Sequence, residues 1–156
     1  MSTTGPSLKG RALRLLAQRE HSRVELERKL AAFEEVPGTL AQALDALQAK
    51  DFINEQRVVD SVVHRRAPRL GAGRVRQELE RKGLDREAVA SAVAALASTE
   101  LARARDVWQK KFGGTSAVDA ADRARQMRFL ASRGFSGEVV RRVLNTPEDT
   151  PDDDLA

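Results

Sequence analysis

The chain has 156 residues, of which 41% are hydrophobic and 32% charged, so it can bury a folded core and is not broadly disordered. It contains no cysteine, which excludes disulfides, thiolate metal sites and cysteine nucleophiles. Aromatic residues make up only 4%, so an extensive aromatic platform for nucleic-acid bases is excluded too. The chain shows no signal peptide and no apolar run approaching the roughly 18 residues of a membrane helix. We therefore expect a cytoplasmic protein.

The net charge of +4 conceals an uneven distribution. The segment from Thr146 onward carries five carboxylates and no Lys or Arg, so the rest of the chain has 27 basic and 18 acidic residues, a charge of +9. A basic body favours nucleic acid or another acidic surface as partner. Arginine on ordinary solvated helix faces is the alternative, and charge alone does not decide between them.

Apolar residues recur at helical spacing along the chain, and no proline falls inside a periodic segment. Ser22 with Glu25, and Thr39 with Gln42, form capping-box patterns, which predict that Ser22 and Thr39 cap helices. Further helix starts are predicted from single capping residues, and the opening helix runs through Leu13–Leu16. These single caps are Asn54, Asp85, Asp119 and Ser136. The pattern gives nine helices in three groups of three.

A short sequence motif occurs twice, at Leu79–Leu84 and Leu130–Phe135. The first leucines of the two copies lie 51 positions apart, and a weaker copy begins at Leu30. Each copy places a glycine, Gly83 or Gly134, after an amphipathic helix. Glycine ends helices in the left-handed conformation without steric cost. A period of about fifty residues indicates about three copies of one helical module.

The predicted fold is therefore all-α, with three tandem three-helix repeat modules forming an elongated, curved domain. The predicted segments are an N-terminal tail (1–8), module 1 (9–53), module 2 (54–98), module 3 (99–145) and an acidic disordered tail (146–156). The acidic tail could instead compete for the basic face within the molecule; we favour disorder.

The search for catalytic chemistry gives mostly negative results. No phosphate-binding loop is present, and Gly71-Ala-Gly73 lacks the third glycine and the strand of a dinucleotide site. His21 and His64 have no second ligand at metal-binding spacing, and we expect structural or surface roles for both. We expect no enzyme, cofactor or metal site.

Basic residues form clusters that indicate a binding surface, and the first cluster begins where the fourth predicted helix ends. Stacked modules could merge such clusters into a stripe that fits a phosphate backbone or an acidic protein groove. The candidate contact residues are Arg65, Arg66, Arg69, Arg74, Arg76, Arg81, Lys82, Arg125, Arg128 and Arg133.

Three separated stretches resemble the RecX family of regulatory proteins. Ala12–Leu30 resembles that family's opening module, Phe52–Arg66 with Gly71–Gly83 its central signature, and Arg133-Gly134-Phe135-Ser136 its closing module. The resemblance covers nearly the whole chain from about Leu8 to Leu144. The first module departs from the pattern, because Ala31–Phe33 lacks the usual glycine cap and Glu55 replaces a common Asp.

The resemblance implies a non-enzymatic protein that binds the RecA recombinase, lodges in the groove of the RecA–single-stranded DNA filament and restrains its activities. It also implies contact with DNA, single-stranded DNA first and double-stranded DNA as a further candidate. The composition predicts no membrane partner, and a monomer suits an elongated repeat. The alternatives are a general nucleic-acid-binding helical protein without a recombinase partner, and an enzyme with an unrecognised helical active site.

Overall fold

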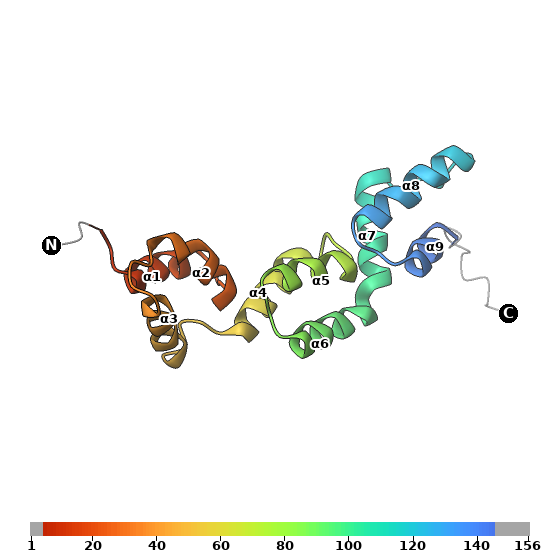
Figure 1. The fold of residues 1–156 in the computed structure, drawn as a ribbon. Coiled ribbons are helices and arrows are strands. Elements are labelled where there is room, and N and C mark those ends of the chain that lie inside the picture. Colours follow the sequence, from red (N-terminus) through yellow and green to blue (C-terminus); the bar gives the residue numbers. More distant parts are fainter. Residues whose placement is uncertain (1–4, 146–156) are drawn as a thin grey trace. The chain divides into compact units, whose positions relative to one another are not determined.

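The computed structural model describes residues 5–145, and this part of the chain is helical without any strand, as the sequence predicts. Figure 1 shows its nine α-helices, which two short 3-10 segments, η1 and η2, supplement. The elements are α1 (Leu8–Gln18), α2 (Arg23–Leu30), η1 (Ala31–Phe33), α3 (Thr39–Ala49), α4 (Glu55–Arg66), α5 (Ala72–Arg81), α6 (Arg86–Leu96), η2 (Ala97–Thr99), α7 (Glu100–Phe112), α8 (Ala120–Ser132) and α9 (Gly137–Asn145). The acidic tail predicted over 146–156 lies outside the described residues.

The chain forms two compact units, which we describe separately. The first comprises the residues through Val63 together with Glu78–Ala90, and the second comprises His64–Gln77 together with the residues from Ser91 onward. Helices α4, α5 and α6 therefore contribute residues to both units. The bounds of the three sequence modules remain a prediction.

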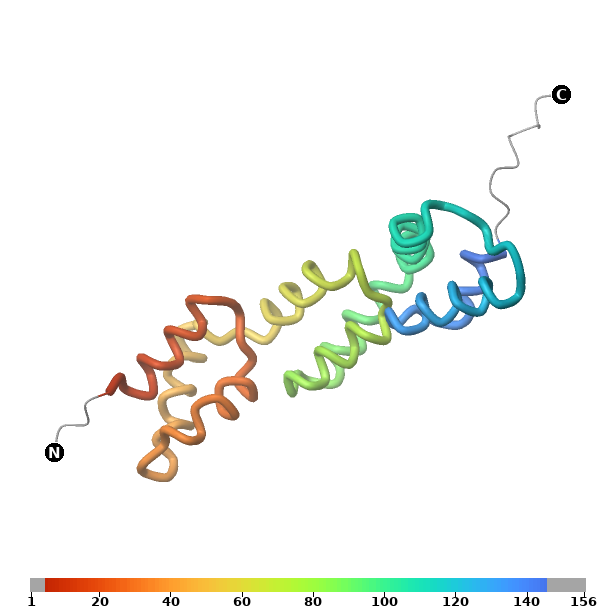
Figure 2. The backbone as a smooth tube through the Cα atoms, turned by 90° about the horizontal axis from the view of Figure 1, so that it is seen from above, coloured from red at the N-terminus to blue at the C-terminus, as the bar shows by residue number. Residues whose placement is uncertain are grey.

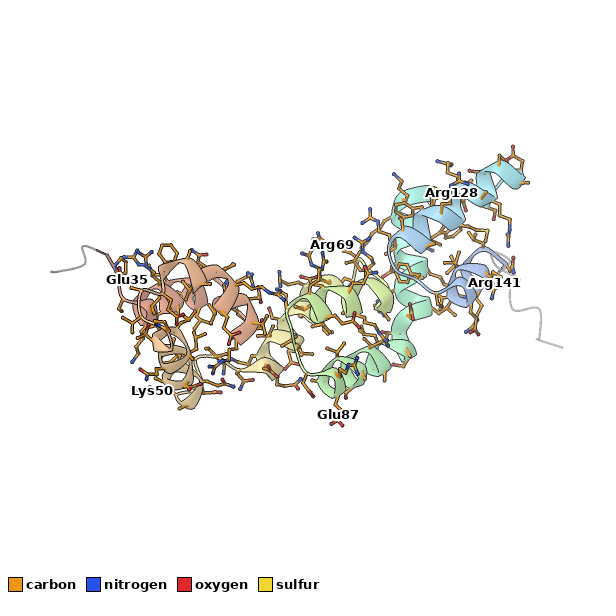
Figure 3. All side chains as sticks on the ribbon, viewed as in Figure 1. Glu35, Lys50, Arg69, Glu87, Arg128 and Arg141 are labelled. Carbon is orange, nitrogen blue, oxygen red and sulfur yellow. The ribbon has the colours of Figure 1, made fainter. Side chains whose placement is uncertain are left out.

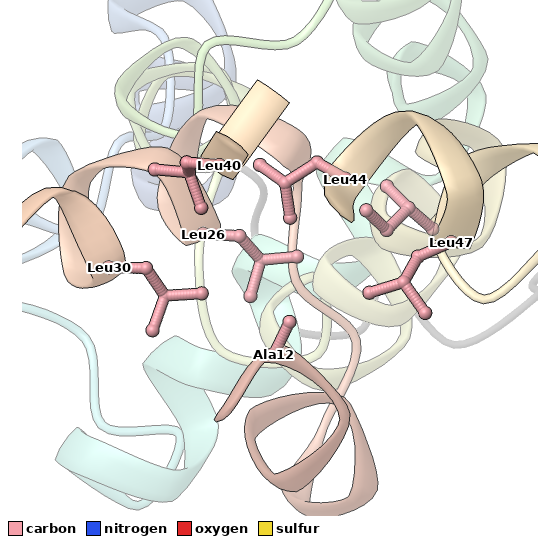
Figure 4. Packing of buried hydrophobic residues seen from close by; sticks show 7 residues of the cluster. Ala12, Leu26, Leu30, Leu40, Leu44 and Leu47 are labelled. Atoms are coloured by element: carbon pink, nitrogen blue, oxygen red, sulfur yellow. The ribbon is translucent and has the colours of Figure 1, made fainter. Parts of the chain in front are cut away.

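The first unit is built on a leucine core where α1, α2 and α3 meet (Figure 4). Leu26, Leu44 and Leu47 are fully buried there, and Ala12 lets α1 approach closely. The predicted capping box opens α2: the Ser22 hydroxyl accepts from the Glu25 N–H, and the Glu25 carboxylate accepts from the Ser22 N–H, both at 3.1 Å. Capping and burial of one face together explain why this short helix forms.

The predicted cap at Thr39 is wrong, because Thr39 is already the first residue of α3. The N-cap is Gly38, whose φ of 92° lies in the left-handed region. Glu34 supplies the capping oxygen instead and accepts from the Leu40 N–H at 2.8 Å. The Thr39 hydroxyl turns back and donates to the Val36 carbonyl at 2.6 Å. A carboxylate from the preceding loop has thus replaced the local cap.

The other four predicted caps are confirmed. The side-chain oxygens of Asn54, Asp85, Asp119 and Ser136 accept from the N–H three residues later at 3.0, 3.3, 2.8 and 3.2 Å, respectively. Each cap satisfies a backbone donor that the first helical turn leaves unpaired. The sequence therefore marked the starts of α4, α6, α8 and α9 correctly.

The second unit has its core between α7, α8 and α9, seen from above in Figure 2. Trp108 from α7 packs in this core with Leu130 from α8 and Val140 from α9. The buried indole N–H of Trp108 donates to the Gln126 side-chain oxygen at 2.9 Å. The one polar atom of the tryptophan is thus paired inside the core.

Candidate functional site

The glycine motif at the end of α8 forms a tight corner, and the start of α5 contacts this corner. Gly134 has a φ of 90°; its N–H donates to the Ala131 carbonyl at 3.0 Å, and the Phe135 N–H donates to the Leu130 carbonyl at 3.3 Å. This bond pair is the Schellman cap. From the α5 side, the Gly71 N–H donates to the Arg133 carbonyl at 2.7 Å and the Gly73 N–H to the Gly134 carbonyl at 3.1 Å. The corner therefore holds two segments of the second unit together.

The glycine motif at the end of α5 forms a similar corner in the first unit, where it contacts the start of α2. Gly83 has a φ of 69° and lies against Val24, whose side-chain atoms come within 2.6–2.8 Å of where a Cβ would stand. The Ser22 hydroxyl donates to the Lys82 carbonyl at 2.6 Å, and Arg28 donates to the Arg81 carbonyl at 2.6 Å. Both glycines are thus architectural.

Nine of the ten candidate contact residues are exposed, and the tenth, Lys82, is largely covered. The Lys82 ammonium lies 3.2 Å from the Glu25 carboxylate, and its side chain is only 12% exposed. Lys82 therefore holds α5 against α2 within the first unit, which leaves little charge for a partner. Arg81, the residue before it, remains exposed on the same helix.

The remaining eight candidates belong to the second unit. In Figure 3, Arg69 and Arg128 lie on the upper side of this unit, whereas Arg141 on α9 lies on its lower side. Arg74 donates to the Ser132 carbonyl at 3.3 Å, and Arg125 pairs with Asp122 at 2.7 Å. Arg65, Arg66 and Arg76 are exposed on α4 and α5.

The structure brings two candidates, Arg69 and Arg133, into one groove of about 330 Å³ in the second unit. Two further cations, Lys110 and Lys111 from the end of α7, lie in the same lining. We call this site the basic groove; it is lined by Pro68, Arg69, Val107, Lys110, Lys111, Phe129 and Arg133. It combines four cations with apolar side chains, and among residues 5–145 no acidic residue lines it.

The aromatic part of the basic groove is Phe129, which stands edge-on to Phe112 with ring centroids 5.4 Å apart. Two groove cations approach the Phe129 ring, the Lys111 Nζ at 5.4 Å from its centroid and the Arg133 Cζ at 5.0 Å. Cations within about 6 Å of an aromatic ring are attracted by its quadrupole. Charge and aromatic surface are thus adjacent in one site.

The loop that carries Arg69 is fixed by a partly buried arginine from α7. Arg103 donates to the carbonyls of Ala67 and Leu70 at 2.9 and 2.7 Å, on either side of Pro68–Arg69, and to the Leu96 carbonyl at 3.1 Å. Burial lowers the pKa of Arg103, but a guanidinium remains protonated in proteins. Arg103 thus positions the Arg69 side of the groove.

The sequence analysis missed Lys110, Lys111 and Phe129. Lysines in a last helical turn are ordinarily explained by the helix dipole, and Phe129 has the spacing of a core residue. Two adjacent lysines, separated from Gly113-Gly114 by Phe112 alone, were the available signal. Only the packing of α8 and of the loop between α4 and α5 against α7 places these residues beside Arg69.

The two histidines show no catalytic arrangement. His21 is buried; its Nδ1 lies 3.0 Å from the Arg19 carbonyl and its Nε2 lies 3.1 Å from the Lys29 ammonium. Burial lowers the pKa of His21, and the neutral ring can donate from Nδ1 and accept at Nε2. His64 is exposed in the last turn of α4. Residues 5–145 contain no group of three side chains placed to hold a metal ion.

A search of the same described residues finds no helix that is both long and apolar enough to cross a membrane. Fold and surface together define a class of protein: a tandem three-helix repeat protein that presents exposed basic side chains and a basic groove.

Two family profiles match the chain. Residues 54–93 match "RecX, second three-helix domain" and residues 98–144 match "RecX, third three-helix domain". The chain is 53% identical to a Regulatory protein RecX of Leptothrix cholodnii over 95% of its own length and 94% of that relative. It is 46% identical to one of Herminiimonas arsenicoxydans, over 94% and 96% of the two chains. The chain belongs to the RecX regulatory protein family.

Solved structures confirm the helical-repeat fold. A crystal structure of a regulatory protein RecX matches with a TM-score of 0.75 at 17% identity, covering 89% of this chain and 72% of that one. RecX from Lactobacillus salivarius matches with a TM-score of 0.72 at 17% identity, covering 88% and 92%. The family resemblance noted in the three sequence stretches is confirmed by the two relatives, which are 53% and 46% identical over 95% and 94% of this chain.

Proposed function

We propose that this chain is a non-enzymatic, monomeric regulator that binds the RecA–single-stranded DNA filament and restrains its ATPase, strand-exchange and co-protease activities in DNA repair and the SOS response. The observation that carries the proposal is membership of the RecX family together with a basic groove in the second unit. We expect a filament of recombinase on DNA to present both acidic protein surface and phosphate. An exposed array of arginines fits both.

Exposure supports a contact role for nine of the ten candidate residues, and the Glu25 ion pair argues against one for Lys82. Several modules that each bind weakly to one filament would reinforce each other through linkage. The contact set we propose is Arg65, Arg66, Arg69, Arg74, Arg76, Arg81, Arg125, Arg128 and Arg133.

The decisive experiment is RecA ATPase activity on single-stranded DNA with this protein titrated in at two salt concentrations. We expect inhibition that weakens as salt rises, because contacts between exposed charges are screened. The double variant Arg69→Ala with Arg133→Ala should inhibit less than the wild type. Lys50→Ala, which removes an exposed cation in the first unit, is the control.

The alternative is a general nucleic-acid-binding helical protein without a recombinase partner. Its affinity for DNA would fall steeply with salt, and adding RecA would change nothing. Unchanged ATPase and strand exchange at excess protein would contradict our proposal and favour this alternative.

A further inference from the structure

We propose that the basic groove is a nucleotide-sized subsite for single-stranded nucleic acid. In this subsite, Phe129 and Val107 receive one base, and the four surrounding cations hold the adjoining phosphates. The inference rests on the proposed function, because it assigns to one groove the nucleic-acid component of the filament. It also makes a claim that can be tested without any recombinase.

Charge is the first argument. The groove lining contains Arg69, Lys110, Lys111 and Arg133, and no acidic residue of the described part of the chain joins them. Across residues 5–145, none of these four cations is ion-paired with a carboxylate, whereas Arg125, only four residues from Phe129, is paired with Asp122. Unpaired cations that converge on one concave site favour a polyanion over an isolated carboxylate.

The apolar floor is the second argument, and it separates nucleic acid from an acidic protein segment. Carboxylates would be satisfied by the cations alone and would make no use of the exposed apolar surface of Phe129, Val107 and Pro68, two of which also pack against the core of the second unit. A base offers a flat π-face to an aromatic ring, while its phosphates reach the cations beside that ring. Arg133 and Lys111 already lie within 5.0 and 5.4 Å of the Phe129 centroid. A base that stacks on Phe129 displaces one of these cations from the ring, and that cation then meets the phosphate beside the base.

The volume of the groove and its preorganised walls favour a single strand over a duplex. About 330 Å³ lies at the lower end of the range for small-molecule sites, so the groove accommodates one nucleotide and not a duplex. A base in a duplex is stacked between its neighbours and cannot enter without being flipped out. The groove is preorganised, because Arg103 donates hydrogen bonds to the loop around Arg69 and the Gly71 N–H donates to the Arg133 carbonyl.

The test measures fluorescence anisotropy of a labelled oligothymidylate with the full chain, without recombinase, over a range of salt concentrations. We expect Lys110→Ala to weaken binding and to make the slope of log affinity against log salt shallower by about 0.7, the value for one phosphate contact on a single strand. Phe129→Leu should weaken binding about tenfold with an unchanged slope, because it removes stacking and no charge. Lys50→Ala, an exposed cation of the first unit, is the matched control.

The outcomes are distinguishable. If Phe129→Leu binds the oligonucleotide as the control does, the subsite is refuted; the same holds if a duplex of equal length binds as tightly with the same dependence on Phe129. Groove variants that bind the oligonucleotide normally but no longer inhibit RecA would make the groove a protein contact, which overturns this inference and leaves the proposed function intact. Loss of oligonucleotide binding with RecA inhibition retained would support the subsite. Trp108 is the only tryptophan, and its fluorescence confirms that each variant's second unit is folded.

Discussion

The Ser22 hydroxyl donates a 2.6 Å hydrogen bond to the backbone carbonyl of Lys82, 60 residues further along the chain. The second unit repeats this relationship, because the Gly71 N–H donates at 2.7 Å to the carbonyl of Arg133. In each case the donor belongs to the residue just before a helix, and the acceptor precedes the corner glycine. The repeated glycine motif therefore specifies both a helix end and a recurring junction with the segment before another helix.

Ser22 serves both its own helix and this junction, so its loss should be costly. Ser22→Ala removes the α2 cap, worth about 1 kcal/mol, and leaves the Lys82 carbonyl without its partner, worth about 1 kcal/mol more. Ser7→Ala is the matched control, since Ser7 only caps α1 through the Gly10 N–H. Urea unfolding of both variants checks the difference, and equal losses would show that the Lys82 bond contributes nothing.

The corner glycines should be far less replaceable than a glycine of similar conformation in open space. Gly113→Ala, at a φ of 66° with no atom within 4 Å of the new Cβ, should cost about 1 kcal/mol. Gly134→Ala places its Cβ 2.5 Å from the backbone N of Arg74, so the backbone must move and the cost should exceed about 3 kcal/mol. Thermal unfolding measures both. Similar losses would mean that the α5 contact yields easily.

Local signals predicted the fold well where the cap and the helix lie together in the sequence. Ser22, Asn54 and Asp119 cap through bonds to N–H groups three residues away, so short windows suffice. Thr39 failed because the capping oxygen came from Glu34, in a loop that only tertiary structure positions.

The basic character of the candidate site could be predicted from the sequence, but the residues that form it could not. A sequence shows that Lys82 is basic, but it cannot show that Glu25 neutralises it across 57 positions. Lys110 joins Arg69 only after α7 folds beside the loop that follows α4. Long-range packing, which carries no local signature, thus decided which cations share a groove.

Glu25 should make stability fall in acid. Burial alone would raise the pKa of this carboxyl, but hydrogen bonds from Arg19 and the Ser22 N–H, with the Lys82 ammonium, lower it to about 2. A lowered folded-state pKa gives stability that is fully present above the unfolded value near 4.5 and is lost as pH falls toward about 2. The loss should be on the order of 3 kcal/mol. Unfolding free energies at pH 5 and pH 2.5 check it.

Two variants give that pH experiment its control. Glu25→Gln should be less stable at pH 5 and should lose much of the decline between pH 5 and pH 2.5. Asp45→Asn removes an exposed carboxylate paired with Arg23 and should keep the wild-type decline. A wild-type decline in Glu25→Gln would assign the acid sensitivity to other groups.

The pair between Trp108 and Gln126 should be needed for stability in the second unit. Gln126→Leu leaves the buried indole N–H without its 2.9 Å acceptor, at a cost of about 2 kcal/mol. Gln109→Leu changes an exposed residue of α7 and should stay within about 0.5 kcal/mol of wild type. Urea unfolding followed by the fluorescence of the single tryptophan measures both. Equal stabilities would show that the buried donor finds another partner.

Arg81, the last residue of α5, and Lys82, which follows it, should separate structural from functional charge. Lys82→Met breaks the 3.2 Å ion pair with Glu25 and should lower stability by about 1–2 kcal/mol, while RecA inhibition and its salt dependence stay as in the wild type. Arg81→Met removes an exposed cation and should show the opposite pattern, with unchanged stability and weaker inhibition at low salt. Urea unfolding and RecA ATPase titrations at two salt concentrations measure both effects. If Lys82→Met weakened inhibition as strongly as Arg81→Met at a temperature where both remain folded, Lys82 would contact the filament despite its pairing.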